Sequence, residues 1–322
     1  MHTGGEPVRI VETGYPEVRG KTILDKRRYA KAELDHLRRI LMYEPRGHYD
    51  MYGVIPVEPD DPDAAMAVLF MHNEGYSTMC GHATIALGRY ALDQGIVPAV
   101  EPETRFVLQC PCGPVTVSVG VEDGRIGEVR FESVGAFAFA MDESVAIGGR
   151  SVRFDIAYGG AFYAIVDAAQ FGLELGVSPI SDLVEAATAL TAAAPQVTSL
   201  SHPGDRDLGF LYGTIITDGH DDGRPSTNVC VFADAQVDRS PTGSGVTARM
   251  ALRRARTDVA IGQRCEFVSL TGSAMTGAVV AETSVGDTPA VTVEVSGRSH
   301  YTGSAEFVVE PDDPLGDGFL LR

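Results

Sequence analysis

Two segments of the chain, one in each half, match each other at a constant spacing. In each, an apolar run ends at a Phe, Phe70 or Phe232, and ten residues later a small thiol or hydroxyl residue, Cys80 or Thr242, precedes a Gly. These two residues are 162 positions apart in a chain of 322, so the offset is half the chain. A duplicated element predicts two facing halves with one site between them, to which each half contributes one reactive position. The same offset recurs in two further pairs, Val129 with Val291 and Glu132 with Glu294.

The composition argues against several classes of partner and location. A net charge of −18 would repel the phosphates of nucleic acids and of anionic membranes. The chain has no apolar run of about 18 residues, and its N-terminus does not follow a signal-peptide pattern. Five cysteines, an odd number in a large chain, do not suggest a disulfide framework. We therefore expect a protein of the reducing cytoplasm, with neither a nucleic acid nor a membrane as partner.

Strand-like and helix-like stretches alternate in the same order in both halves, which predicts an α/β (α+β) fold. Apolar residues at helical spacing and typical helix ends predict four helices, at Asp25–Met42, Thr84–Gln94, Ser181–Ala194 and Ser244–Thr257. Short apolar or alternating runs predict strands at Val8–Val11, Met66–Met71, Phe106–Gln109, Val115–Val119, Gly127–Glu132, Ala161–Val166, Phe210–Thr217, Asn228–Ala233, Glu266–Leu270, Ala278–Glu282, Ala290–Val295 and Phe307–Glu310.

The Gly-rich stretch from Gly148 to Gly160 is the weakest point between the two halves. We therefore expect an N-terminal α/β domain, residues 1–150, that carries Cys80 and is joined by a C-terminal strand within 306–322. The C-terminal α/β domain, residues 151–305, carries Thr242.

The reactive positions precede glycines at the start of helices. The N-terminus of a helix presents free N–H groups that bind anions, so two facing N-termini would hold a carboxylate between them. The same partial positive charge lowers the pKa of a cysteine there, from about 8.5 toward neutrality. Cys80 is therefore a candidate thiolate base, which His82 could stabilise.

Each candidate also has a structural interpretation. An unselected cysteine is usually a buried structural thiol, but the duplicated context favours a reactive role for Cys80. For His82, a structural and a catalytic role are equally compatible with the sequence. Asp238 is either a turn or helix-entry aspartate or a ligand for a substrate ammonium group. The remaining cysteines, which lack a second pair at metal-ligand spacing or lie in strand-like runs, are expected to be structural: Cys110, Cys112, Cys230 and Cys265.

Two motifs of this chain resemble the signature motifs of the proline racemase family: Met79-Cys80-Gly81-His82 and Asp238-Arg239-Ser240-Pro241-Thr242-Gly243-Ser244-Gly245. The likeness covers nearly the whole chain. It extends to the blocks His2–Pro7, Glu44–His48, Asp50–Gly53, Tyr158–Tyr163 and Asp312–Gly316.

The resemblance implies a diaminopimelate-epimerase-like fold. Two pseudo-symmetric domains would each wrap a curved β-sheet around a central helix, with the active site in the cleft between them. It also implies a homodimer, a small imino acid as substrate, and neither a metal nor an organic cofactor. Racemases of the family carry cysteine at both reactive positions, whereas this chain has Thr242, whose hydroxyl is too weak an acid to exchange a proton near neutral pH. Cys80 with Thr242, and Ala83 after His82, resemble the branch that dehydrates trans-3-hydroxy-L-proline.

Carried over to this chain, the resemblance implies Cys80 as the base for the α-proton and Thr242 at the vacant base position. The ring nitrogen would contact Asp238. The substrate carboxylate would contact Gly81, His82, Gly243 and Ser244. The expected reaction gives 2-pyrroline-2-carboxylate, which tautomerises to 1-pyrroline-2-carboxylate. The alternatives are a proline racemase or 4-hydroxyproline 2-epimerase, a hydrolase with Cys80 as nucleophile, and a non-catalytic amino-acid-binding protein.

Overall fold

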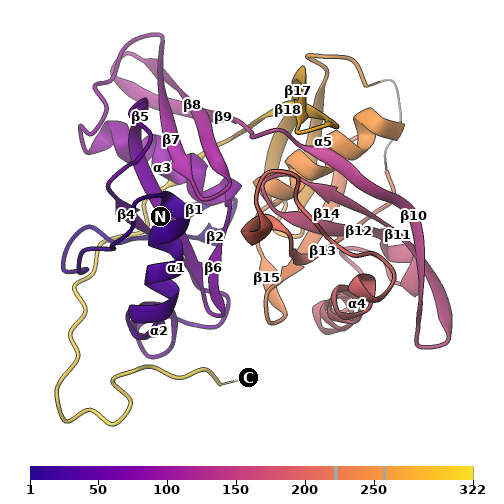
Figure 1. Cartoon of the computed structure of the whole chain (residues 1–322), viewed down its shortest axis with the longest axis horizontal. Helices are drawn as coiled ribbons and strands as arrows, with labels where there is room; N and C mark the ends of the chain where they lie inside the picture. Colours follow the sequence, from indigo (N-terminus) through magenta and orange to yellow (C-terminus); the bar gives the residue numbers. More distant parts are fainter. Residues whose placement is uncertain (221–223, 257–258, 322) are drawn as a thin grey trace.

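The computed structural model describes residues 1–220, 224–256 and 259–321, and its two halves lie side by side (Figure 1). The first half contains β1 (His2–Thr3), β2 (Glu6–Pro7), β3 (Arg9–Ile10), α1 (Ile23–Glu33), α2 (Asp35–Met42), β4 (Tyr52–Val57), β5 (Ala64–His72), β6 (Gly75–Ser77), α3 (Gly81–Asp93), β7 (Glu103–Cys110), β8 (Gly113–Glu122), β9 (Arg125–Glu132) and β19 (Ser299–His300). The second half contains β10 (Phe137–Ile147), β11 (Arg150–Tyr158), β12 (Phe162–Asp167), α4 (Ile180–Ala193), β13 (Leu211–Thr217), β14 (Ser226–Phe232), β15 (Gln236–Asp238), α5 (Gly243–Arg256), β16 (Arg264–Ser269), β17 (Ala274–Val285) and β18 (Thr288–Gly297).

The strand order repeats the duplication seen in the sequence. Within the described residues, one 16-stranded sheet follows the path β10-β11-β12-β13-β14-β16-β17-β18-β9-β8-β7-β5-β4-β3, and its two remaining strands, β15 and β6, pair with β14 and β5 beside this path. From β12 to β3 this order is symmetric about the central β18–β9 pair. The parallel pairs are symmetric too, because β12–β13 matches β3–β4 and β14–β16 matches β5–β7. At the centre, Glu132 lies directly opposite Glu294, the pair found at the repeat offset.

Two like charges directly opposite each other destabilise an antiparallel pair unless cations lie nearby. Arg105 binds Glu132 at 2.9 Å. Arg130 and Arg264 bind Glu294 at 3.4 and 3.3 Å. The junction between the two halves is thus a hydrogen-bonded strand pair whose charges are balanced.

Each half wraps its strands around one buried helix. Almost every residue of α3 is buried, and so are the first eleven residues of α5. One hydrophobic core spans both halves and includes Val117, Phe131, Val246 and Met250. The predicted α+β class and the arrangement of two pseudo-symmetric halves are confirmed. No helix of the described residues is long and apolar enough to cross a membrane.

The predicted helices Thr84–Gln94, Ser181–Ala194 and Ser244–Thr257 correspond to α3, α4 and α5, although the end at Thr257 lies outside the described residues. The prediction of one helix over Asp25–Met42 is wrong. The chain leaves the helical conformation at Leu34, and α2 starts in a new direction. This break lets Arg38 bind Asp35 and donate to the His72 carbonyl at 2.9 Å.

The predicted boundary at residue 150 falls beside the tight turn between β10 and β11, which pair with each other in the second half. Gly148 and Gly149 both have positive φ in this turn, which is why the stretch looks like a linker in the sequence. The division of the chain into domains 1–150 and 151–305 stays a prediction.

The predicted strand Phe307–Glu310 is not formed, although the C-terminal segment does return to the first half (Figure 1). Of the predicted segment 306–322, the last residue lies outside the described chain. Arg46 donates to the Val308 carbonyl at 3.1 Å, and Glu44 forms an isolated β-bridge with Phe319. Side-chain donors and one bridge therefore hold the segment where a strand was expected.

Candidate active site

The N-termini of α3 and α5 meet where the two halves face each other. Cys80 is the N-cap of α3, and Gly243 is the first residue of α5. A Cβ atom on Gly81 would lie 2.4 Å from the Gly243 Cα, and one on Gly243 would lie 2.7 Å from the Gly81 Cα. The approach of the two backbones leaves no space for a side chain. Glycine is therefore required at both positions.

One cavity lies at this meeting point. All seven residues predicted for the site line it: Cys80, Gly81, His82, Asp238, Thr242, Gly243 and Ser244. Five further residues complete the lining, namely Tyr52, Met79, Tyr163, Tyr212 and Phe232. Its volume is about 10 Å³ for the centre of a water-sized sphere, which is room for about one water molecule. A larger ligand can enter only when the two halves move apart.

The sequence analysis placed none of those five residues in the site. Met79 directly precedes Cys80, whereas the other four come from strands far apart in the chain that only the tertiary fold brings together. Signals were present for Met79, which lies in a signature motif, for Phe232, which ends the repeated apolar run, and for Tyr52 and Tyr163, which lie in blocks resembling a known family.

Cys80 and His82 form a pair at the start of α3. The Cys80 Sγ lies 3.0 Å from the His82 Nδ1, and the His82 Nε2 lies 3.2 Å from the Pro7 carbonyl oxygen. A carbonyl oxygen only accepts, so Nε2 carries the hydrogen and Nδ1 accepts from the thiol. The Ala83 N–H also points at Sγ, at 3.4 Å. His82 is thus arranged to accept the proton of Cys80.

Burial raises the pKa of the Cys80 thiol well above its usual value, and the charge of Asp238 acts in the same direction. The Ala83 N–H lowers this pKa, as expected at a helix N-terminus, but its effect is smaller than that of burial. In the closed cavity, burial thus outweighs the helix N-terminus, and the expected shift of the thiol pKa toward neutrality is not found. The sequence shows the helix start but does not show how completely the site excludes water.

Thr242 lines the cavity from the second half and is hydrogen-bonded to Asp238. The Thr242 Oγ1 donates to Asp238 Oδ2 at 2.8 Å, and the Ser240 N–H donates to Asp238 Oδ1 at 2.7 Å. Asp238 therefore shapes this turn, which is one of its two predicted roles. It also lines the cavity, where a role as ligand for a substrate ammonium group stays a prediction. Thr242 has a φ of 65°, which is unusual for a β-branched residue. The turn thus holds Thr242 in a strained conformation beside the start of α5.

Ser244 lies in the first turn of α5, where its Oγ is 2.7 Å from the Tyr163 hydroxyl. The backbone N–H groups of Gly243 and Ser244 belong to the first turn of a helix, which the helix itself cannot satisfy. Such groups attract a carboxylate. The second half therefore offers anion-binding donors, and the first half offers an ionisable thiol.

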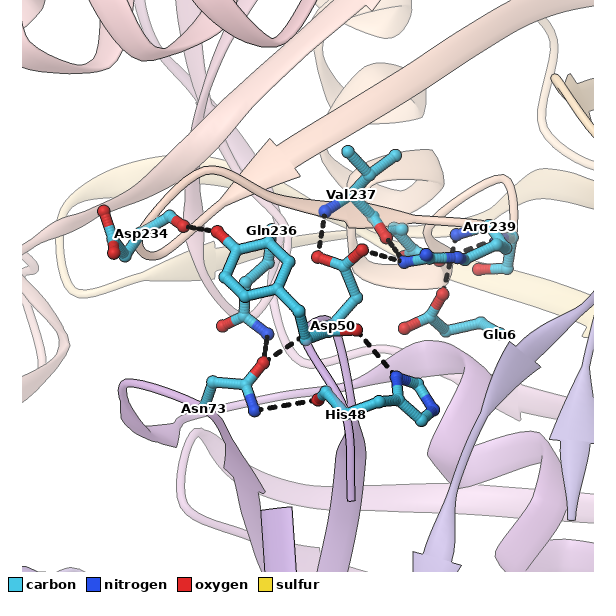
Figure 2. Close-up of polar contacts among 11 residues, drawn as sticks. Glu6, His48, Asp50, Asn73, Asp234, Gln236, Val237 and Arg239 are labelled. Carbon is cyan, nitrogen blue, oxygen red and sulfur yellow. Dashed lines mark hydrogen bonds and ion pairs between the residues drawn. The ribbon is translucent and has the colours of Figure 1, made fainter. Parts of the chain in front are cut away.

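Polar contacts join the halves beside the cavity, as Figure 2 shows. Asp50 accepts from the Val237 N–H at 3.0 Å and binds the Arg239 guanidinium at 2.6 Å. Glu6 accepts from the Arg239 N–H at 2.7 Å. We call the contributing residues the polar clasp: Glu6, Asp50, Asn73, Gln236, Val237 and Arg239.

Asn73 is the centre of the other part of the clasp (Figure 2). Its side-chain oxygen accepts from the Asp50 N–H at 2.8 Å and from the Gln236 amide at 2.7 Å. Gln236 and Arg239 belong to the segment that leads to Thr242. The clasp therefore fixes the second reactive position against the first half.

The model of the family described as Proline racemase matches residues 1–320 of the chain. The chain belongs to the proline racemase family. It is 57% identical over 330 residues to the trans-3-hydroxy-L-proline dehydratase of Homo sapiens, covering all of this chain and 93% of the relative. It is 54% identical over 326 residues to the trans-L-3-hydroxyproline dehydratase of Saccoglossus kowalevskii, covering all of both chains. The predicted family is confirmed.

Among solved structures, a hydroxyproline epimerase from Agrobacterium vitis with bound trans-4-hydroxy-L-proline has a TM-score of 0.94. The two chains share 29% sequence identity over 99% of this chain and 93% of the epimerase. The predicted fold is thus the fold of this member of the proline racemase family.

The remaining cysteines of this proline racemase family member are free thiols outside the cavity lining. Cys230 and Cys265 lie in the core, as expected, and so does Cys110, while Cys112 is partly buried. Among the described residues, no group of three or more His, Cys, Asp and Glu side chains is placed to hold a metal ion.

Proposed function

We propose that this protein dehydrates trans-3-hydroxy-L-proline to 2-pyrroline-2-carboxylate and water, with Cys80 as the base. The main support for this proposal is the chemical difference between Cys80 and Thr242, which line the cavity from the two halves. One wall presents an ionisable thiol beside an imidazole, and the other presents a hydroxyl that already donates to Asp238. The curated relatives named above are trans-3-hydroxyproline dehydratases, which agrees with this chemistry.

The stereochemistry explains why one base is enough. In trans-3-hydroxy-L-proline the 3-hydroxyl lies opposite the carboxylate, so it shares a ring face with the α-hydrogen. The Cys80 thiolate removes the α-proton, and the C–H electron pair forms the C2–C3 double bond. The C3–O bond breaks, and the departing oxygen takes the proton back from the thiol. The enamine then tautomerises to 1-pyrroline-2-carboxylate.

The thiolate forms when His82 Nδ1 accepts the proton of Cys80, along the 3.0 Å contact between them. Burial raises the pKa of Cys80 and lowers that of His82, so we assign this transfer to the open cleft, before the cavity closes on the substrate. We assign the substrate carboxylate to the first-turn donors of both helices, at Gly81, His82, Gly243 and Ser244. Donors aimed at this carboxylate also stabilise the charge that develops on it as the α-proton leaves.

Asp238 is assigned to the ring nitrogen of the substrate. Each of its oxygens accepts one hydrogen bond in the structure and keeps a further lone pair for a substrate N–H. Thr242 fills the position where a racemase would need a second base. Its hydroxyl proton is held by Asp238 and does not exchange with the α-carbon, so the opposite face of the ring receives no proton.

The test uses purified protein with trans-3-hydroxy-L-proline and no added cofactor. We expect a ketimine product from the wild type, and a loss of at least about a thousandfold in kcat for Cys80→Ala because the base is removed. Full turnover by Cys80→Ala would refute the assignment of the base. Formation of D-proline from L-proline by the wild type would favour a racemase instead.

Two further expectations concern the protein in its cell. We propose a homodimer, on the basis of the family resemblance, and a cytoplasmic location, since all five cysteines are free. Sedimentation of the purified protein tests the first expectation, and fractionation of the source cells tests the second.

A further inference from the structure

The departing hydroxyl group of the substrate must meet the wall of the cavity that carries Cys80. This follows from the proposed function, on which the inference rests, because the hydroxyl and the α-hydrogen share one ring face. The first half contributes Met79, Cys80, Gly81, His82 and Tyr52 to the lining. Of these side chains, Tyr52 is the one that bears a hydroxyl, and the mechanism above does not use it.

Tyr52 is held firmly in place. It begins β4, it is 2% exposed, and its ring meets the His82 ring edge-on with centroids 4.9 Å apart. Its hydroxyl oxygen lies 2.5 Å from the Oγ of Ser77, a buried residue at the end of β6. The hydroxyl is also close enough to Cys80 for each group to shift the pKa of the other. The phenol is thus fixed beside the base.

We propose that the Tyr52 hydroxyl donates a hydrogen bond to the 3-hydroxyl oxygen of the substrate as that oxygen departs. Either oxygen of the Tyr52–Ser77 contact can be the donor; we assign that role to Ser77, so that the phenolic hydrogen points toward Cys80 and, with substrate bound, toward the departing oxygen. Tyr52 is therefore a catalytic residue for the breaking of the C3–O bond, and its effect on removal of the α-proton is limited to a minor contribution to the pKa of Cys80.

The protons and electrons of this step balance without a further reactant. The α-proton passes to Cys80 and then to the departing oxygen, which leaves as water. The electron pair of the C3–O bond goes with the oxygen, and Tyr52 keeps its own proton throughout. Burial raises the pKa of Tyr52 well above its usual value, so the phenol keeps its proton near neutral pH.

The test separates the two bond-breaking events with two substrates. trans-3-Hydroxy-L-proline needs both events, whereas L-proline has no leaving group and reports only the removal and return of the α-proton. With Tyr52→Phe we expect dehydration to slow by about 10- to 100-fold, because a donor to the developing negative charge is lost. We expect the exchange of the L-proline α-proton in heavy water to change by less than about threefold, because Cys80 is intact.

Equal losses in both reactions would overturn the inference, because Tyr52 would then act only through Cys80. An unchanged rate of dehydration would overturn it as well. A wild-type protein that exchanges the α-proton of L-proline but does not dehydrate 3-hydroxyproline would refute the proposed function itself, and this inference with it.

Two further variants complete the experiment. Ser77→Ala removes the partner that orients the phenol, so it should slow dehydration more than exchange, and equal losses here would also count against the inference. Tyr90→Phe is the matched control, since Tyr90 lies on α3 and donates to Glu12 at 3.2 Å, away from the cavity. Both of its rates should stay at the wild-type level, and melting temperatures confirm that each variant folds.

Discussion

At the scale of single residues, the proposed reaction depends on which groups accept hydrogen bonds or protons from Cys80 and Thr242. Asp238 accepts a hydrogen bond from the Thr242 hydroxyl, which keeps its proton, and His82 is placed to receive the proton of Cys80. The two reactive positions therefore differ in their partners as well as in their own chemistry. A cysteine at position 242 should therefore allow proton exchange on the second face of the ring.

Thr242→Cys provides this test, because it places a second ionisable group opposite Cys80. We expect the variant to exchange the α-proton of D-proline in heavy water, which the wild type should not do. The rate should be well below that on the Cys80 side, since the second half offers no equivalent of His82 in the described lining. If a folded variant exchanges no α-proton of D-proline, residue 242 does not face the α-carbon from the side opposite Cys80.

Glu6 provides a second test at this scale, through stability. Burial and the charge of Asp238 raise its pKa well above the usual value. The folded protein therefore holds this proton more tightly than the unfolded chain. The stabilisation is present at low pH and is lost as the pH rises from the unfolded-state pKa toward the folded-state pKa.

Glu6→Gln cannot ionise, and its amide oxygen can still accept from the Arg239 N–H. We expect the melting temperature of this variant to match the wild type near pH 4 and to exceed it by about 3 °C or more at pH 8. The exposed Glu74→Gln is the control and should show no such trend. A melting temperature below the wild type at pH 8 would mean that Glu6 is ionised and stabilising there.

At the scale of elements, the contact of α3 with α5 determines the geometry of the site. A methyl group on Gly81 would meet backbone atoms of Gly243, which have little freedom to move. Gly81→Ala should therefore push the two helix N-termini apart, although alanine favours a helix more than glycine does.

For Gly81→Ala we expect a loss of about a hundredfold or more in kcat/KM, since misplacement by an ångström has costs of this size. Gly120→Ala is the matched control, because its Cβ would lie at an ordinary 3.5 Å from the nearest atom. The rate of dehydration measures both. Near-normal activity of Gly81→Ala would show that the helices need not touch.

The elements that could be predicted from the sequence are those whose apolar residues recur at a regular helical or strand spacing. This spacing located α3, α4, α5 and the central strands to within a few residues. The break at Leu34 was missed because it serves a distant contact, the bond of Arg38 to the His72 carbonyl. The β10–β11 hairpin was read as a linker because its glycines mark a turn and a linker alike.

For the site, the repeat identified Cys80, Thr242 and their neighbours without any structure. Tyr212 could not be placed, because nothing in its apolar run, residues 210–217, distinguishes a cavity residue from a core residue. The raised pKa of Cys80 could not be predicted either, since burial is a property of the closed molecule. The sequence thus indicates residues that line the cavity, and the fold determines their environment.

At the scale of the whole molecule, the halves are joined by the β9–β18 pair and by the polar clasp. The cavity between them holds about one water molecule, so the substrate must enter an open form. The β9–β18 pair is part of a continuous sheet, whereas the clasp consists of side-chain contacts that can break singly. We therefore expect the clasp to control how often the cleft is closed.

Asp50→Asn tests this expectation, because asparagine tolerates the φ of 72° at this position and can still accept from the Val237 N–H. The variant loses only the charge that binds Arg239. If the closed form becomes less populated, the apparent affinity falls in proportion. We expect KM to rise about fivefold, kcat to change little, and the Val237 amide to exchange its hydrogen faster.

Arg39→Ala breaks an exposed ion pair with Asp317 and is the control, since such pairs contribute little to stability. Its kinetics and its amide exchange should match the wild type. Identical KM and amide exchange in Asp50→Asn would show that the clasp does not govern closure.

Proton transfer is expected on one face of the substrate ring only. Proton NMR of the wild-type protein in heavy water, with trans-3-hydroxy-L-proline and in parallel with L-proline, measures this directly. The account predicts 1-pyrroline-2-carboxylate from the first substrate and, from the second, deuterium at the α-carbon with the L configuration kept. D-proline, or a 3-hydroxyproline epimerised at the α-carbon, would contradict it.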